Sequence, residues 1–184
     1  RRGYSWDKTQ ETVVPGDDST PVIRIPNIHE TLNLSDLLYL RNISQEALKI
    51  SAVTKDWVLF VGSNGNPERI GDSVLISEDR PMVFASFIQG IAIKNPTEIL
   101  PEFFAQWMRL HNVHQSFSKS SQQTTGLANF SWSAVKRLPF RYPIDMEEQR
   151  RIISALTNVQ DAIIATQQQH IDASQLKIAL MQQL

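Results

Sequence analysis

Short apolar runs separated by polar breaks fill the N-terminal half of the chain. Residues 57–61 are continuously apolar and stop at Gly62, which is typical of a strand buried on both faces. Residues 73–76 and 82–93 have the same character. Residues 22–25 lie between two prolines, and because proline has no N–H to donate, they are expected to form a short strand near a sheet edge. This half therefore predicts short strands with irregular connections.

One helix is expected next, followed by an exposed segment. Apolar positions recur with helical spacing from Ile99 to Leu110, and Pro101 suits a first turn. This helix is expected to end near Phe117. Residues 118–126 hold no apolar side chain, so they predict a solvent-exposed loop.

The chain ends in a pattern that predicts a single long helix. Asp145 can serve as its N-cap, with Glu148 completing a capping box, and no glycine or proline follows up to Leu184. Apolar residues recur every seven positions on both sides of a polar centre at 166–170. A core helix folded onto its own domain is one interpretation, and a coiled coil with a partner helix is the favoured one. The residues expected to form the pairing seam are Ile152, Leu156, Val159, Ile163, Ile171 and Leu180.

Composition narrows the class of protein. The 184 residues are 41% hydrophobic and 20% charged, which excludes a disordered chain, and the absence of cysteine excludes disulfides, cysteine-bound zinc and thiol catalysis. That absence fits a reducing cytoplasm. No apolar run is long enough to span a membrane, and the opening Arg1 is interpreted as a fragment boundary without a signal peptide.

Charge is distributed unevenly along the chain. The formal net charge of −1 argues against a strongly basic nucleic-acid binder. Residues 103–144, however, contain no acid and five cations, which are Arg109, Lys119, Lys136, Arg137 and Arg141. This stretch fits either a face that meets an anion or a solvated surface patterned by chance, and charge alone leaves both open.

Catalytic chemistry is not expected. His111 and His114 lie three residues apart, but a metal site would need a third ligand, and the nearest acids are Glu102 and Asp145. The turn that begins at Gly62 lacks the lysine of a phosphate-binding loop. We therefore expect no catalytic residue, no metal and no cofactor.

Two polar segments, 64–69 and 118–126, carry the side chains that nucleic-acid readers use. Amides and hydroxyls can bond base edges, while cations bond phosphates. A solvated linker is the alternative, and composition alone favours it. The candidate DNA-binding residues are Asn64, Asn66, Arg69, Lys119, Ser120, Ser121, Gln122, Gln123, Thr124, Lys136 and Arg137.

Several motifs together resemble the specificity (S) subunit of type I restriction-modification systems. The strongest is KRLPFRYP at 136–143 followed by MEEQRRII at 146–153, which is similar to the junction between a target recognition domain and its long helix. TTGLANF at 124–130 resembles the Gly-x-x-Asn-apolar element of that family. Residues 21–28 and 56–70 are similar to its first strand and to its central strand with a Gly-rich turn.

The resemblance implies an α+β fold. It comprises a small target recognition domain over 1–144, with a mixed, barrel-like β-sheet and short helices, and a long helix over 145–184 that pairs antiparallel with a partner helix. It also implies a role. Each recognition domain reads one half of a bipartite site in double-stranded DNA, and the helices dock methyltransferase (M) subunits. Restriction (R) subunits are possible further partners. Methylation and cleavage belong to those partners, so a cytoplasmic non-enzyme is expected.

This chain departs from the family pattern because it has one recognition domain and one helix. It is therefore either half of a longer S subunit or a half-size protein that dimerises and reads a palindromic bipartite site. Two rival classes remain: a protein-interaction module that acts through its helix, and an enzyme that uses the His111 and His114 helix.

Overall fold

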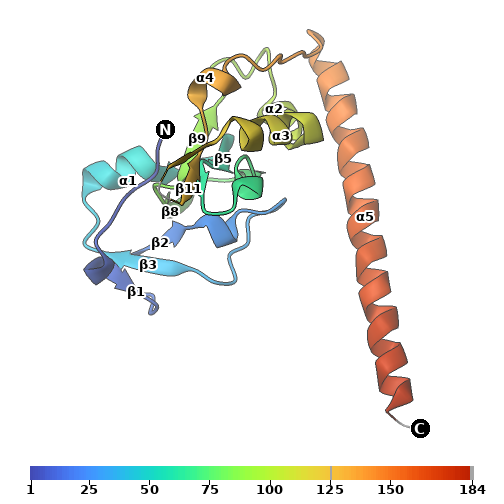
Figure 1. Cartoon of the computed structure of the whole chain (residues 1–184), viewed down its shortest axis with the longest axis horizontal. Coiled ribbons are helices and arrows are strands. Elements are labelled where there is room, and N and C mark those ends of the chain that lie inside the picture. Colours follow the sequence, from blue (N-terminus) through green and yellow to red (C-terminus); the bar gives the residue numbers. More distant parts are fainter. Residues whose placement is uncertain (125, 183–184) are drawn as a thin grey trace. The chain divides into compact units, whose positions relative to one another are not determined.

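The computed structural model describes residues 1–124 and 126–182, with the backbone alone described at 122–124. The chain forms two compact units, Arg1–Tyr142 and Pro143–Leu184. The first unit is a mixed α+β domain with three separate sheets (Figure 1). The α+β prediction is confirmed, but no closed barrel forms in the described part of the domain, so the barrel-like expectation is wrong.

The largest sheet has five short strands in the order β1-β3-β2-β8-β4. Their bounds are β1 Glu11–Thr12, β2 Ser19–Ile23, β3 Leu38–Arg41, β4 Ala52–Val53 and β8 Arg80–Phe84. Only β2 and β8 run parallel, which makes the sheet mixed.

The strand expected near a sheet edge is instead central. β2 lies between β3 and β8, so that expectation was wrong. The sheet tolerates Pro21 because β2 pairs with β8 only at Val22 and Ile23, beyond the residue that lacks an N–H. Val22 and Ile23 are both fully buried, as a central strand requires.

The second sheet has the order β7-β5-β9 and confirms the strand predicted at 57–61. The strands are β5 Trp57–Val61, β7 Ser73–Leu75 and β9 Ile88–Ala92. β5 is central and antiparallel to both neighbours, and its residues from Val58 to Val61 are buried. The third sheet joins β6 Ser63–Asn64, β10 Gln122–Thr124 and β11 Leu127–Asn129 in the order β10-β11-β6.

Short helices connect and cover these sheets. They are η1 Lys8–Gln10, η2 Ile25–Asn27, α1 Gln45–Ser51, η3 Pro67–Arg69, α2 Pro101–Arg109, α3 His111–Ser120 and α4 Trp132–Val135. The single helix expected up to Phe117 is in fact two, because Leu110 adopts an extended backbone (ψ 132°) between α2 and α3. The break allows Met108 on α2 and Phe117 on α3 both to be buried, each against a different part of the core.

Gly71 supports the turn between η3 and β7. Its φ is +99°, and a Cβ built there would lie 2.9 Å from the Cβ of Phe117. We therefore expect Gly71→Ala to lower the free energy of unfolding by about 1–3 kcal/mol, through backbone strain and overlap. Urea denaturation measures this, with Gly65→Ala as the matched control, since its nearest neighbour would lie 3.8 Å away. Equal losses in the two variants would contradict the assignment.

The second unit is the long helix α5, Met146–Met181 (Figure 1). Asp145 caps it as predicted, and its carboxylate accepts a hydrogen bond from the Glu147 N–H (2.9 Å). The predicted seam residues Leu156, Val159 and Ile163 are 41%, 59% and 45% exposed. No described helix combines the length and apolarity that a membrane span requires.

Candidate nucleic-acid interface

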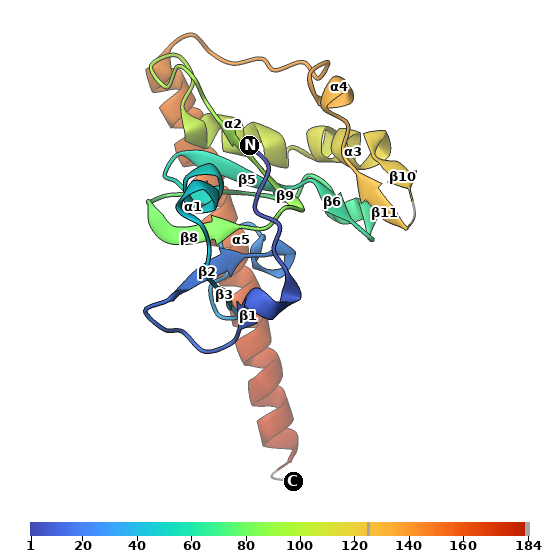
Figure 2. The same ribbon diagram turned by 90° about the vertical axis from the view of Figure 1, so that its left-hand side faces the viewer.

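The two polar segments singled out in the sequence meet in the third sheet. β11 pairs on one side with β10 and on the other with β6 (Figure 2). Ala128 therefore lies opposite both Gln123 and Asn64. Asn129 likewise lies opposite Gln122 and Ser63. Segments about 60 residues apart in sequence are thereby hydrogen-bonded into one small surface. We call β6, β10 and β11 with the turn at 65–69 the polar sheet.

The prediction of an exposed loop over 118–126 was wrong. Residues up to Ser120 complete α3, and β10 and β11 form a hairpin. The predicted residues Gln122, Gln123 and Thr124 contribute the backbone of β10, while their side chains, and all of Thr125, lie outside the described residues. The polar composition of residues 118–126 favoured a loop. The sheet could not be predicted from this segment alone, because the strand that extends it, β6, is remote in sequence.

Asn64 and Asn66 shape the turn beside the hairpin. The Asn64 side-chain oxygen accepts a hydrogen bond from the Asn66 N–H (3.0 Å), and the Asn66 oxygen accepts one from the Glu68 N–H (3.0 Å). Both amide groups thus hold the backbone with their oxygens. Within the described part of the chain, neither side-chain nitrogen of Asn64 and Asn66 donates a hydrogen bond.

Arg69 is held inside the fold rather than presented to solvent. Its Nε donates to Asp72 Oδ2 (2.6 Å), and one Nη donates to the carbonyl of Ile28 (2.8 Å). The other oxygen of Asp72 lies 2.9 Å from His114 Nε2. Asp72 therefore connects the turn of the polar sheet to α3, and Arg69 has a structural role that sequence patterning did not reveal.

The end of α3 carries one exposed cation and two hydroxyls that are bonded to the helix backbone. Lys119 is exposed, and its Nζ donates to Gln115 Oε1 (3.1 Å). The hydroxyls of Ser120 and Ser121 donate to the carbonyls of Phe117 and Ser118. They close the last turn of α3, so their donors are already used before any ligand binds.

Four of the five cations in the acid-free stretch face solvent. Lys119, Lys136, Arg137 and Arg141 are exposed, and none of them forms an ion pair with a described residue. Arg109 differs, because its Nη2 donates to the Glu30 carbonyl (2.6 Å) and burial lowers the pKa of its guanidinium. The exposed four therefore carry positive charges that no described acidic side chain pairs.

An aromatic cluster holds the polar sheet to the domain. The Phe60 ring on β5 makes edge contacts with Phe117 (5.6 Å between centroids), Phe130 (5.2 Å) and Trp132 (6.3 Å). Phe117 belongs to α3, Phe130 directly follows β11, and Trp132 belongs to α4. The cluster thus couples the elements that flank the hairpin to the central strand of the second sheet.

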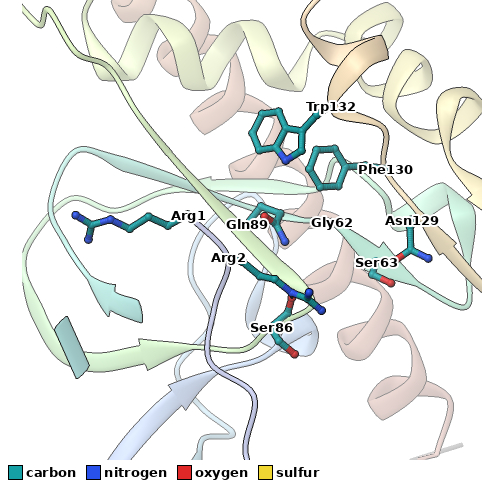
Figure 3. Close-up of a pocket in the computed structure, with 9 residues that line it drawn as sticks. All are labelled: Arg1, Arg2, Gly62, Ser63, Ser86, Gln89, Asn129, Phe130 and Trp132. Carbon is teal, nitrogen blue, oxygen red and sulfur yellow. The ribbon is translucent and has the colours of Figure 1, made fainter. Parts of the chain in front are cut away.

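An open hollow of about 440 Å³ lies beside β6 and β11 (Figure 3). Its lining consists of Arg1, Arg2, Gly62, Ser63, Ser86, Gln89, Asn129, Phe130 and Trp132. None of these was among the predicted site residues. Asn129 could have been found, since it belongs to the Gly-x-x-Asn element, whereas no sequence signal brings Arg2 next to it.

The two histidines considered as metal ligands serve other contacts. His114 pairs with Asp72, and His111 bonds Gln115 (2.8 Å). Within residues 1–124 and 126–182, no cluster of three or more histidine or acidic side chains could hold a metal.

Comparison with known structures shows the same fold in three proteins. The S subunit of a type I restriction-modification system from M. genitalium has 12% identity and a TM-score of 0.58, covering 88% of this chain and 36% of that chain. The HsdS subunit from Thermoanaerobacter tengcongensis has 15% identity and a TM-score of 0.63, with coverages of 89% and 41%. A third solved structure, which concerns complex assembly and conformational transition of the type I R-M system, has 12% identity and a TM-score of 0.64. The match covers 90% of this chain and 36% of that chain.

This chain spans less than half the length of each of these proteins. No curated protein sequence matches it. The family model for the type I restriction modification DNA specificity domain matches residues 5–173, which is most of the chain, including nearly all of the first unit and much of α5. The chain therefore belongs to the type I restriction modification DNA specificity domain family.

Proposed function

We propose that this chain reads one half of a bipartite site in double-stranded DNA for a type I restriction-modification complex. The convergence of two polar segments on one sheet, beside exposed and unpaired cations, carries the proposal. Separate loops would each need their own ordering on DNA, whereas a hydrogen-bonded sheet presents its donors preorganised. DNA is the partner whose phosphates match the cations and whose base edges match amides.

Different residues have different parts in this reading. Lys119, Lys136 and Arg137 supply phosphate contacts, which position the domain and make binding sensitive to salt. Asn64, Asn66 and the residues of β10 supply contacts to base edges. Arg69 is not assigned a contact with DNA, because its guanidinium is bonded to Asp72 and to a backbone carbonyl.

Gln122→Ala and Gln123→Ala are expected to relax specificity. An amide that bonds an adenine bidentately discriminates against the wrong base by about 1–3 kcal/mol, so each variant should lose that amount at a single base pair. The measurement is selection of binding sites from a randomised duplex library by the chain assembled with its methyltransferase subunits. Gln175→Ala on α5 is the control and should leave the selected sequence unchanged. Unaltered selection by both β10 variants would remove β10 from the reading surface.

The long helix is proposed to pair antiparallel with a second copy or with the second half of a longer S subunit, and to dock methyltransferase subunits. Its support is the row of exposed apolar side chains at Leu156, Val159, Ile163, Ile171 and Leu180, since an isolated helix does not keep such a row in water without a partner. Methyl transfer and cleavage then belong to the partner subunits, and this cytoplasmic chain is not an enzyme.

A protein-interaction module acting through α5 alone is the second candidate, and the same exposed seam favours it. The two differ in what the first unit does. The DNA-reading proposal expects the chain to bind a mixed-sequence duplex at low salt, with affinity falling as salt rises. The interaction-module candidate expects no such binding under the same conditions.

A further inference from the structure

The hollow beside the polar sheet has the chemistry of an anion site. Arg2 is the arginine that directs its guanidinium into it, since the Arg1 guanidinium points away and lies over the Trp57 ring (4.4 Å). No carboxylate lines it, and its other polar side chains include two amides and two hydroxyls. We propose that it binds one phosphodiester group of the DNA backbone, with the adjoining deoxyribose against Trp132. This inference rests on the proposed function, and it adds a phosphate contact from Arg2, a cation outside the acid-free stretch.

Arg2 is fixed in place by its backbone neighbours. It forms an antiparallel bridge with Gln89, and the Gly3 N–H donates to the Ile88 carbonyl (3.2 Å). A Cβ built at Gly3 would lie 2.2 Å from the Ala85 carbonyl oxygen, so the backbone is packed closely at this point. The Arg2 side chain therefore starts from an anchored backbone instead of a free tail.

The Arg2 guanidinium keeps its strongest donors available. Its Nε donates to the Ser86 carbonyl (3.3 Å), which orients the planar group across the hollow (Figure 3). No acid in the described part of the chain forms an ion pair with Arg2. The two terminal nitrogens are left as a fork, which is the arrangement that suits bidentate bonding to a phosphate.

Ser63 supplies a second, independent sign of a ligand. The residue is only 8% exposed and lines the hollow, yet its hydroxyl has no hydrogen-bond partner among the described residues. Buried polar groups in folded proteins are nearly always bonded, so an unsatisfied hydroxyl calls for a missing partner. A phosphate oxygen in the hollow would accept its proton.

Asn129 links the hollow to the reading surface. It pairs with Ser63 across the sheet, so both side chains point to the same face, and both line the hollow. Leu127, two residues earlier on β11, shares that face and is 39% exposed. A DNA strand lying over this face of the polar sheet would therefore bring its backbone to the hollow, where Trp132 is 42% exposed and offers an apolar contact.

The salt dependence of DNA affinity tests the site. For the full chain on a mixed-sequence duplex, Arg2→Ala should reduce the slope of log affinity against log salt by about 0.9, the value for one phosphate contact. Asn129→Asp, which is isosteric and places a carboxylate in the hollow, should weaken binding to every duplex sequence by about tenfold at low salt. Arg41→Ala removes an equal charge from β3, outside the hollow, and should leave the slope unchanged.

The outcomes separate this inference from the proposed function. If the wild-type chain binds no duplex at any salt concentration, both are overturned. If it binds with a salt-dependent affinity, but Arg2→Ala and Asn129→Asp leave slope and affinity as they were, only the hollow is overturned. Inorganic phosphate is the third probe. Suppose that phosphate quenches Trp132 fluorescence in the wild type but not in Arg2→Ala, and that Arg2→Ala binds DNA as the wild type does. The hollow would then be a site for free anions, and the inference would be overturned.

Discussion

The double substitution Val159→Glu and Ile163→Glu is expected to convert an associating chain into a monomer. Both side chains belong to the seven-residue repeat of α5 and are exposed in the single chain, 59% and 45% respectively. In a paired helix they would be buried, and a carboxylate without a partner in an apolar seam costs several kcal/mol. Because each substitution occurs twice in a homodimer, the dissociation constant should rise by a factor of about a thousand or more.

Sedimentation at high micromolar concentration measures this effect, with Asn158→Glu and Ala165→Glu as the matched control. These two exposed positions lie away from the seam residues on the helix surface, so they add the same charge without entering the seam. The control should sediment like the wild type. A wild-type chain that is already monomeric under these conditions would count against self-pairing and would leave the twin helix of a longer S subunit as the partner.

The largest loss of stability is expected from Phe60→Ala. The Phe60 ring is fully buried and contacts Phe117, Phe130 and Trp132. Removing it leaves a cavity among these rings, and a change of this kind costs about 3–5 kcal/mol. That is a large share of the total stability of a domain of this size, so the midpoint of urea unfolding should fall sharply.

The position of Phe60 also links stability to DNA binding. The rings it contacts belong to the elements that flank the hairpin, so Phe60→Ala should weaken DNA binding even where the domain remains folded. Phe60→Leu keeps most of the volume and should lose distinctly less on both measurements. Equal stability of Phe60→Ala and the wild type would show that the aromatic cluster does not hold the domain together.

Local patterns were sufficient for the elements that are determined locally. The buried run at 57–61 became the central strand β5, because continuous apolarity requires cover on both faces. The capping residue Asp145 and the absence of glycine or proline after it were enough for α5. Both features depend on neighbours within a few residues, so they can be predicted from the sequence.

The elements that were wrongly predicted depend on contacts between residues remote in sequence. Pro21 suggested an edge strand, but register with β8 begins one residue later, so the strand is central. Gln122 to Thr124 looked like a loop, because only pairing through β11 to remote β6 makes them a strand. Leu110 carries no helix-breaking chemistry, yet it divides the predicted helix so that both halves reach the core.

The candidate site was predicted in its parts but not in its assembly. Asn64, Asn66 and Lys119 were predicted from residue type, and the sheet brings their segments together. Arg69 has the same chemistry as a base reader, but Asp72 lies 2.6 Å from it and engages it internally. The hollow was missed because the Arg2 segment reaches Ser63 and Asn129 only through the folded domain.

The most direct test is to sequence the DNA sites methylated when this chain is combined with methyltransferase subunits. If the chain reads DNA and pairs through α5 with its own copy, we expect one recurrent bipartite motif with two-fold symmetry. The bases of this motif should change when the segment from β10 to β11 is exchanged for that of another family member. Methylation without any recurrent motif, or a motif indifferent to that exchange, would contradict the account.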